Sequence, residues 1–474
     1  MSNIAQRVRE LFLTISKIPR PSYHEEKIAD YICEFAKNCG HDYYRDGENN
    51  VFVKLAATEG YEEHAPVLLQ GHTDMVCEKN EGTEHDFLTE GIKVYEENGW
   101  LTAEGTTLGA DNGVAVAIML CAIEGGFKAH PPIECLFTTA EEVGLDGAKA
   151  FDYSKVAARK LINMDGENEN VVIVGSAGGV RTDVTFNCEY EALGGDTLEI
   201  KISGLYGGHS GENINSGRAN ANIIMGRLLA ELSECEGARL VDLRGGSKDN
   251  AIPREAVAVV AVKDVEAVKN IAKSFERDMA LELNDDDKNF AVNVKAVSGY
   301  EKMLDANTAA KIITFISVSK NGIIEMSKKL KGLVEYSRNL GVIRTEEGKI
   351  KLAFSSRSAI DRQLDAAERE IRMLAELLGA ECNSHGRYPG WVYNGESELA
   401  DEYIKACREL FGKEVRKITI HAGIECSTIK SKLPDMDPIC CGPNMKDLHS
   451  PDEAIEIESF ARYTQAIERL LANL

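Results

Sequence analysis

Five side chains that can bind metal ions follow one another along this chain of 474 residues. They are His72, Asp111, Glu142, Asp165 and His449. Imidazole and carboxylate groups suit Zn²⁺ and its neighbours in the first transition row. Five ligands are one more than a single tetrahedral zinc needs, but they can hold two ions with open positions for water if one carboxylate bridges. The pattern therefore predicts a two-metal centre for hydrolysis, in which both ions contact the attacking and departing oxygens.

The first four of these residues lie where an expected strand ends or an expected helix begins. Apolar runs bounded by turn-forming residues predict buried strands over 66–70, 133–139 and 161–165, and a helix over 114–123 with Asp111 at its first turn. Side chains that leave the carboxyl ends of strands in an open α/β sheet converge in one crevice. The order of the elements therefore predicts that these candidate ligands meet.

Two further carboxylates accompany the candidate ligands. Asp74 follows His72 by two residues, and side chains i and i+2 of an extended chain point to the same side. Asp74 can therefore orient His72 or adjust the charge at the metal. Glu141 directly precedes Glu142, so a second carboxylate lies beside that ligand.

Each of these positions also has a purely structural interpretation when it is taken alone. His72 or Asp165 can be an ordinary hydrogen-bonded group, the pair 141–142 suits the acidic start of a helix, and 111–113 suits a turn. Their succession within one α/β segment favours a metal centre over several independent structural roles. Cys77 lies close to His72 and could compete for the metal. The favoured interpretation is that Cys77 is a small buried side chain.

Six short segments together resemble a known family. They are GHTDMV at 71–76, GADNGVAVA at 109–117, TTAEEVGLDGA at 138–148, NMDGE at 163–167, GGHSGENI at 207–214 and HSPDE at 449–453. In this order they resemble the co-catalytic dizinc exopeptidases, and most closely the aminoacyl-histidine dipeptidase branch, also called β-alanyl-histidine or cytosolic nonspecific dipeptidases. The likeness extends over nearly the whole chain.

The resemblance implies a role for each candidate residue of the metal centre. It places His72, Asp111 and Asp165 on one zinc ion, and Asp111, Glu142 and His449 on the other, so that Asp111 bridges. It makes Glu141 the general base and Asp74 the partner that supports His72. The implied cofactor is two Zn²⁺ per chain, with Co²⁺ or Mn²⁺ as possible substitutes.

Three residues outside the metal centre are candidates for contact with a substrate. The resemblance implies that His209 reaches an active site, often that of the neighbouring subunit of a homodimer, and stabilises the oxyanion; the alternative is a loop histidine without a role. Arg357 can bind a substrate carboxylate with its guanidinium fork, or it forms a surface salt bridge. Glu425 lies in a tract that resembles the family's substrate-pocket loop, where it would meet a free amino group.

The expected fold is an α/β catalytic domain, with a central mixed sheet between helices, that is interrupted by an inserted α+β lid domain. Residues 1–178 and 389–474 would form the catalytic domain and 179–388 the lid. Within the insertion we expect strands over 187–202, 251–262 and 350–356, and helices over 215–234, 264–283 and 359–378, with Asp264 as an N-cap. After it we expect a helix from 397, strands over 415–420 and 436–440, and a final helix from 452.

Charge and cysteine content limit the classes of partner. The chain has 54 basic and 77 acidic residues, a formal charge of −23, which disfavours nucleic acid and anionic membranes because phosphate contacts need clustered Lys and Arg. The apolar run near Val114 is too short to span a bilayer. The 12 cysteines form no Cys-x-x-Cys pair, and residues 1–7 contain no signal-peptide core, so we expect a cytoplasmic protein.

The function that these features predict is zinc-dependent hydrolysis of short peptides by a metal-activated water. Following the resemblance, we expect dipeptides of the Xaa-His type, including β-alanyl-histidine, as substrates. An aminoacylase, a carboxypeptidase or a tripeptidase on the same fold remains open. A more remote alternative is a non-catalytic metal-dependent scaffold, which would leave Glu141 and Asp74 without a role.

Overall fold

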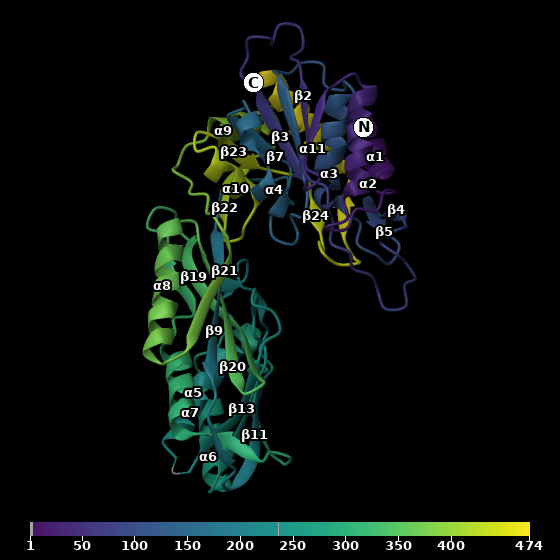
Figure 1. The fold of residues 1–474 in the computed structure, drawn as a ribbon. Coiled ribbons are helices and arrows are strands. Elements are labelled where there is room, and N and C mark those ends of the chain that lie inside the picture. The colour runs from purple at the N-terminus through teal and green to yellow at the C-terminus, as the bar shows by residue number, and fades with distance from the viewer. Residues whose placement is uncertain (1–2, 236) are drawn as a thin grey trace. The chain divides into compact units, whose positions relative to one another are not determined.

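The computed structural model describes residues 3–235 and 237–474, and the chain folds as two compact units (Figure 1). The first unit comprises Met1–Ser176, Tyr393–Thr419 and Ile424–Leu474, and the second comprises Ala177–Val392 and Ile420–Gly423. The first unit is therefore assembled from segments that precede and follow the second. Residues 1, 2 and 236, which belong to the predicted catalytic domain and lid, lie outside the described residues.

The first unit is built around a mixed eight-stranded sheet in the order β1-β2-β6-β3-β7-β23-β8-β22. Its strands are β1 (Tyr43–Arg45), β2 (Val51–Leu55), β3 (Val67–His72), β6 (Ile133–Thr138), β7 (Lys160–Asn163), β8 (Val171–Ser176), β22 (Arg416–Ile420) and β23 (Asp437–Cys440). Neighbours β6, β3, β7 and β23 run parallel, whereas β1–β2, β2–β6 and β23–β8 pair antiparallel. The predicted mixed sheet is thus confirmed.

Helices pack against this sheet and against one another. They are α1 (Asn3–Ile15), α2 (Glu26–Asn38), α3 (Ala110–Ile123), α4 (Asp146–Ala150), α9 (Glu398–Phe411), α10 (Glu425–Lys432) and α11 (Ile457–Asn473), with a 3-10 turn at Tyr153–Lys155. Helix α1 packs between α3 and α11, and α3 contacts β3. A separate four-stranded sheet has the order β24-β25-β5-β4, with bounds Met445–Lys446, Ala454–Glu456, Trp100–Ala103 and Val94–Glu97.

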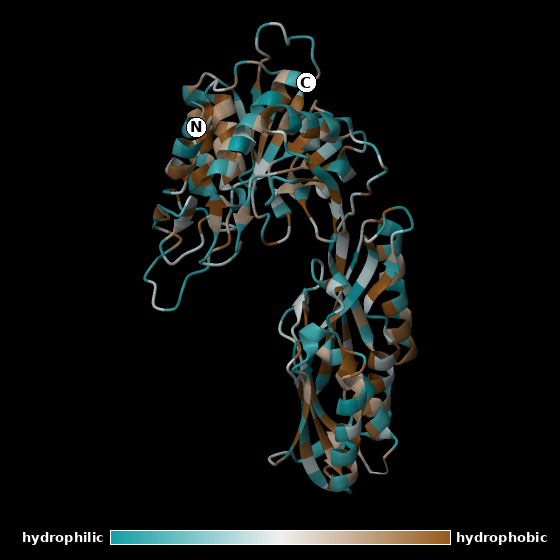
Figure 2. Cartoon of the chain, turned by 180° about the vertical axis from the view of Figure 1, so that it is seen from behind, coloured by the Kyte–Doolittle hydropathy of each residue, from teal (hydrophilic) through white to brown (hydrophobic). Residues whose placement is uncertain are grey.

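The central elements form where their sequence allows complete burial. Every residue of β3 and β6 is buried, as expected for apolar strands of a parallel sheet covered on both faces. From Gly113 onward every residue of α3 is buried, because this helix is apolar on all sides. By contrast α2 buries only one side, and Figure 2 shows hydrophobic and hydrophilic residues on different sides of such helices.

The second unit contains a nine-stranded sheet with helices packed on it. Its path runs β16-β11-β15-β13-β19-β20-β9-β21, and β18 pairs with β19. The strands are β9 (Gly178–Asn187), β11 (Asp196–Ser203), β13 (Arg239–Gly245), β15 (Ala256–Val262), β16 (Ala291–Val297), β18 (Gly322–Met326), β19 (Val334–Glu346), β20 (Lys349–Ser358) and β21 (Glu381–Tyr388). Short strand pairs join β10 (Tyr190–Ala192) to β17 (Lys302–Leu304) and β12 (Gly208–His209) to β14 (Ala251–Ile252).

The helices of the second unit cover its hydrophobic core, which includes Leu228, Phe315 and Phe354. They are α5 (Ala221–Ser233), α6 (Val265–Met279), α7 (Ala306–Val318) and α8 (Asp361–Leu377), with 3-10 turns at Ile214–Ser216 and Asp285–Asp287. The predicted N-cap of α6 is confirmed, since the Asp264 carboxylate accepts a hydrogen bond from the Ala267 amide. Within residues 3–235 and 237–474, no helix has both the length and the apolar character that a membrane span needs.

Several predicted boundaries were wrong. The strand expected over 187–202 is the end of β9 followed by β10 and β11, and the strand expected over 251–262 is β14 and β15 separated at Pro253. The helix expected from 215 begins only at Ala221, because Gly217 adopts a positive φ of 71° and the Asn220 side chain caps the amides of Asn222 and Ile223. The final helix begins at 457 rather than 452, because 454–456 pair with β5 as β25.

Candidate active site

All five predicted metal ligands lie in the first unit, and the structure brings them together. His72 ends β3, Asp111 lies at the start of α3, Glu142 and Asp165 follow β6 and β7, and His449 lies between β24 and β25. His72 Nε2 is 3.0 Å from Asp111 Oδ1 and 3.4 Å from Asp165 Oδ1. His449 Nε2 is 3.2 Å from Asp111 Oδ2 and 3.1 Å from Glu142 Oε2. Each oxygen of the Asp111 carboxylate therefore faces a different histidine, the arrangement that a bridging ligand needs.

The chemistry of this cluster fits divalent metal ions. Single ligand atoms of His72, Asp111 and Glu142 all lie within 4.8 Å of one another. Glu142 Oε1 is buried and has no hydrogen-bond partner among the described residues. A buried carboxylate oxygen without a partner is costly, and a metal ion would satisfy it. Histidine nitrogens with several carboxylates form a donor set typical of zinc.

The electrostatics of the cluster lead to the same conclusion. Burial lowers the pKa of His72, but the carboxylates of Asp165 and Asp111 outweigh it and raise the pKa well above its ordinary value. Hydrogen bonds to Asp111 and Glu142 raise the pKa of His449 to about 11. The carboxylates thus stabilise positive charge at this place, and without metal ions the protonated histidines provide it. Metal ions would take the place of these protons, so binding should release them.

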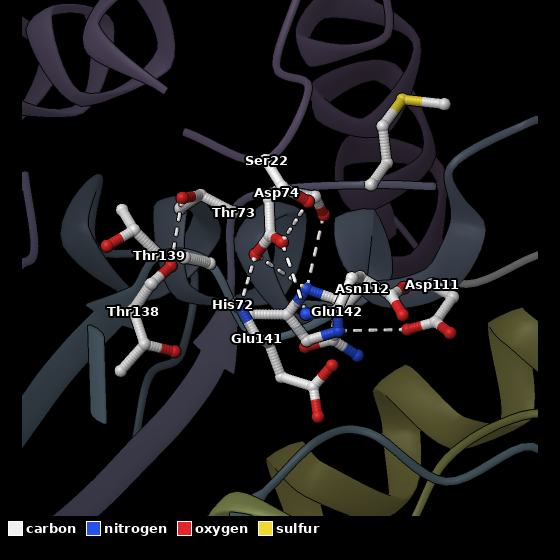
Figure 3. Close-up of polar contacts among 12 residues, drawn as sticks. Ser22, His72, Thr73, Asp74, Asp111, Asn112, Thr138, Thr139, Glu141 and Glu142 are labelled. Carbon is white, nitrogen blue, oxygen red and sulfur yellow. Dashed lines mark hydrogen bonds and ion pairs between the residues drawn. The ribbon is translucent and has the colours of Figure 1, made fainter. Parts of the chain in front are cut away.

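Asp74 connects the His72 ligand to the loop that contains Glu141 and Glu142 (Figure 3). Its carboxylate lies 3.4 Å from His72 Nδ1, and its backbone carbonyl lies 3.1 Å from the same nitrogen, so Nε2 faces the cluster. The carboxylate also accepts hydrogen bonds from the amides of Glu141 at 3.1 Å and Glu142 at 3.3 Å, and from Ser22 Oγ at 2.8 Å. Burial would raise the pKa of Asp74, but His72, and after it Ser22 and the Glu141 amide, lower it overall. The predicted proximity of Asp74 to His72 is present.

Glu141 has the environment of a proton acceptor. In Figure 3 its carboxylate points away from Asp74. No hydrogen bond or ion pair to this carboxylate occurs within the described part of the chain. Burial raises the pKa of Glu141 well above its ordinary value, although His72 opposes the shift. A carboxyl group with a raised pKa and free oxygens can take a proton and hold it during a reaction.

The segment before α2 supplies two supporting residues that the sequence did not predict. Ser22 donates to Asp74, as described above. Glu25 is buried, and its carboxylate accepts a hydrogen bond of 2.9 Å from the amide of Ala140, the residue before Glu141. The segment 21–25 lies far from the ligands in the sequence and has no motif of its own, so no local signal indicates its role.

Glu425 lies in the first unit, in the first turn of α10. It is fully buried, and its Oε2 accepts hydrogen bonds of 2.5 Å from Gln70 Nε2 and 2.9 Å from Thr138 Oγ1. Burial raises the pKa of Glu425 to about 7. Its contact with a substrate amine stays a prediction. Cys77 is half-buried, and burial raises its pKa to about 11, which disfavours the thiolate that would bind metal.

His209 and Arg357 both belong to the second unit, where they lie side by side. Arg357 Nη2 is 3.4 Å from His209 Nε2, and Nη1 donates a hydrogen bond of 2.9 Å to the Tyr388 hydroxyl. Arg357 is only 7% exposed and has no acidic partner among residues 3–235 and 237–474, so the alternative of a surface salt bridge is wrong. Burial and the Arg357 charge lower the pKa of His209, which favours the neutral form of its imidazole.

Comparison with known proteins identifies the family. The model of peptidase family M20/M25/M40 matches residues 68–473, which include all five candidate ligands. The chain belongs to peptidase family M20/M25/M40. The resemblance predicted from the six segments is thereby confirmed at the level of the family.

Individual M20 relatives agree with the predicted branch. The chain is 37% identical over 473 residues to the cytosol non-specific dipeptidase of Escherichia coli (strain K12), covering 99% of this chain and 98% of the relative. It is similar to the crystal structure of aminoacylhistidine dipeptidase from Vibrio alginolyticus, with a TM-score of 0.90, 36% identity and coverage of 100% of this chain and 98% of that one. A tripeptidase from Staphylococcus aureus shares the fold, with a TM-score of 0.57 and 16% identity over 99% of this chain and 98% of that one.

Proposed function

We propose that this chain is a dizinc dipeptidase that hydrolyses short peptides with free termini, with Xaa-His dipeptides such as β-alanyl-histidine as preferred substrates. The observation that carries the proposal is the Asp111 carboxylate, which faces His72 with one oxygen and His449 with the other, beside the free carboxylate of Glu141. The identity to a cytosol non-specific dipeptidase and the likeness to an aminoacylhistidine dipeptidase support the substrate class.

The five candidate ligands would hold two ions. In this assignment His72 and Asp165 would hold one zinc, Glu142 and His449 would hold the other, and Asp111 would be shared by both; Co²⁺ or Mn²⁺ would be the substitutes. When bound, the ions supply Lewis acidity and lower the pKa of a water molecule. Every other part of the mechanism depends on the chain's own side chains.

Glu141 acts as the general base in this mechanism. It takes a proton from the attacking water and later passes a proton to the leaving amine. Its burial raises its pKa, which makes the carboxylate a better proton acceptor. Asp74 keeps His72 Nε2 directed at the cluster and fixes the backbone of the Glu141 loop. No covalent intermediate is needed.

Arg357 and His209 are proposed to contact the substrate. Arg357 is buried and has no acidic partner within the described residues, so its guanidinium is suited to a substrate carboxylate, since its fork matches the two oxygens. His209 lies beside it, and its imidazole N–H would donate a hydrogen bond to the oxyanion of the tetrahedral intermediate. Glu425 remains the candidate for the free amino group.

The proposed assembly is a homodimer in the cytoplasm, in which His209 serves its own or the partner's site. Strand β21 is the last strand of the nine-stranded sheet, and Met373 and Leu377 are exposed on α8. An unpaired sheet edge with apolar neighbours supports pairing with a second copy. All 12 cysteines are free, which supports a reducing compartment, as does the cytosolic location in the name of the relative.

A substrate panel tests the proposed function. Two substrates are compared, an unblocked Xaa-His dipeptide and the same dipeptide with its C-terminus amidated. We expect kcat/KM to be lower for the amide by about one to two orders of magnitude, because a charged hydrogen-bonded pair of roughly 1.5–3 kcal/mol is lost. Arg357→Ala should lower kcat/KM similarly on the acid and little further on the amide. The acetylated dipeptide and a tripeptide should be cleaved poorly.

A buried arginine of the same sheet provides the control. Arg338 is 2% exposed but is paired with Glu370, so Arg338→Ala should leave the ratio of acid to amide cleavage unchanged. Equal cleavage of acid and amide by the unmodified protein would refute carboxylate capture by Arg357. Preferred cleavage of the acetylated dipeptide would indicate an aminoacylase, and preferred cleavage of the tripeptide would indicate a tripeptidase.

A further inference from the structure

A single buried carboxylate holds the loop that leads into Asp111. Glu453 Oε2 accepts hydrogen bonds from the amides of Leu108 at 2.7 Å and Gly109 at 2.9 Å. Its Oε1 accepts from the amides of Ala110 at 2.8 Å and Asp111 at 3.3 Å. Glu453 itself is only 2% exposed. Four consecutive backbone N–H groups therefore converge on one side chain from a distant part of the chain.

The conformation of this loop explains why it needs such an acceptor. Gly109 adopts a left-handed conformation with φ of 71°, and Asp111 has φ of −80° and ψ of 109°, so the amides up to Asp111 are outside the regular hydrogen bonds of α3. Buried N–H groups without acceptors are costly. A carboxylate is an acceptor with about four lone-pair sites, and hydrogen bonds to its charge are stronger than those to a neutral group. The Glu453 carboxylate therefore has enough acceptor sites for the four N–H groups, and its negative charge suits these donors.

Arg20 binds backbone carbonyls at the same loop, whereas Glu453 binds its amides. Its Nη2 donates to the Gly109 carbonyl at 2.5 Å, and its Nη1 donates to the carbonyls of Thr73 at 2.9 Å and Asp74 at 3.1 Å. The side chain is 1% exposed. Arg20 thus ties the loop before Asp111 to the segment directly after His72.

Glu453 also belongs to the segment that contains His449, four residues earlier. The contacts of Glu453 and Arg20 therefore join three ligand-bearing segments, those of His449, Asp111 and His72. A displacement of the backbone at Glu453 relative to the loop before Asp111 would break these hydrogen bonds. Side chains that orient metal ligands in this way contribute strongly to metal affinity.

We propose that Glu453 is a positioning residue of the metal centre, which fixes the Asp111 carboxylate between His72 and His449 through the backbone of 108–111. This inference rests on the proposed two-metal function. It predicts that removing the Glu453 charge weakens metal binding although Glu453 would touch neither ion nor substrate.

The test is a zinc titration of the metal-free protein in a competing chelator, for the unmodified chain and for Glu453→Gln, Glu453→Asp and Glu134→Gln. Glutamine offers one acceptor oxygen and turns its N–H₂ toward N–H donors, so Glu453→Gln should weaken zinc binding by about 10–100-fold. Glu453→Asp keeps the charge and should recover part of the affinity. Glu134 is the matched control: it is 3% exposed and accepts hydrogen bonds from the amides of Ala157 and Ala158, away from the ligands.

The control separates positioning from general stability. Both glutamine variants should lower the unfolding temperature of the metal-free protein, but only Glu453→Gln should change zinc affinity. Unchanged zinc affinity in Glu453→Gln would overturn the inference, as would an equal loss in Glu134→Gln. If Glu453→Gln does not fold, the Glu453→Asp titration decides: weaker zinc binding than in the unmodified chain supports the inference, and unchanged zinc affinity overturns it. An unmodified chain that binds no zinc would instead refute the proposed function.

Discussion

Glu141→Gln should lower kcat by about 10²–10⁴-fold while the protein keeps its metal ions. Glutamine preserves the shape of the side chain but cannot accept the proton of the attacking water. The Glu141 carboxylate contacts none of the five candidate ligands through a hydrogen bond or ion pair among the described residues, so its replacement should leave the cluster intact. Steady-state kinetics and metal analysis of the same preparation measure the two properties together.

Glu142→Gln is the matched control for this prediction, since it changes the neighbouring carboxylate in the same way. Glu142 Oε2 lies 3.1 Å from His449 Nε2, and its buried Oε1 has no partner in the part of the chain that the structure describes, so this variant should lose metal. The opposite pattern, with metal lost in Glu141→Gln and retained in Glu142→Gln, would reverse the roles of the two carboxylates.

Asp111→Asn should have the largest effect on metal binding. The substitution removes the charge that both histidines face, and removing one member of a buried charged set costs about 3–5 kcal/mol, which is roughly a hundred- to a thousand-fold or more in affinity. Because Asp111 would serve both ions, we expect metal content to fall well below two per chain and turnover to become undetectable. Metal content after dialysis and the kcat of the dialysed protein measure the effect.

Asp146→Asn provides a nearby comparison. Asp146 lies in the first turn of α4, where its carboxylate contacts the Tyr23 hydroxyl and Lys149 rather than any candidate ligand. This variant should retain both ions and most of the activity. Two tightly bound ions in Asp111→Asn would show that Asp111 is not the bridge.

The ligand-bearing part of the first unit could be predicted from the sequence because its signals are local. Strands β3, β6 and β7 are apolar runs that end at His72, Glu142 and Asp165 within a few residues, and parallel strands bring their carboxyl ends to one edge. The i, i+2 spacing likewise placed Asp74 beside His72. The residue types, the strand ends and the turn before α3 were enough to predict that the first four ligands meet, whereas the place of His449 came from the resemblance to the family.

Long-range contacts explain what could not be predicted. Glu453 accepts hydrogen bonds from backbone amides more than 340 residues away, and Arg20 donates to backbone carbonyls. Because every residue type has these backbone groups apart from the proline N–H, the sequence of the bound segments does not indicate either contact. The delayed start of α11 depends on the pairing of β25 with β5, which lies equally far along the chain. Strand β19 was not predicted because its sequence includes the polar residues Arg338 and Asn339, which are buried and bind Glu370 and the Ala251 carbonyl of other segments.

The remaining alternatives differ in substrate more than in fold. Membership of peptidase family M20/M25/M40 and the assembled cluster argue against a non-catalytic scaffold, because such a protein would have no use for the free carboxylate of Glu141. The Staphylococcus aureus tripeptidase has the same fold at 16% identity, so the fold alone does not choose between dipeptides and tripeptides. The choice depends on the residues that contact the two ends of the substrate, Arg357 among them.

The most direct test of the two-metal account is a titration of activity with zinc. Protein stripped by a chelator is mixed with increasing Zn²⁺, and hydrolysis of an unblocked Xaa-His dipeptide is followed at each step. We expect no turnover in the metal-free protein and activity that rises to a plateau at two equivalents of zinc per chain. Full activity after complete removal of metal would contradict it.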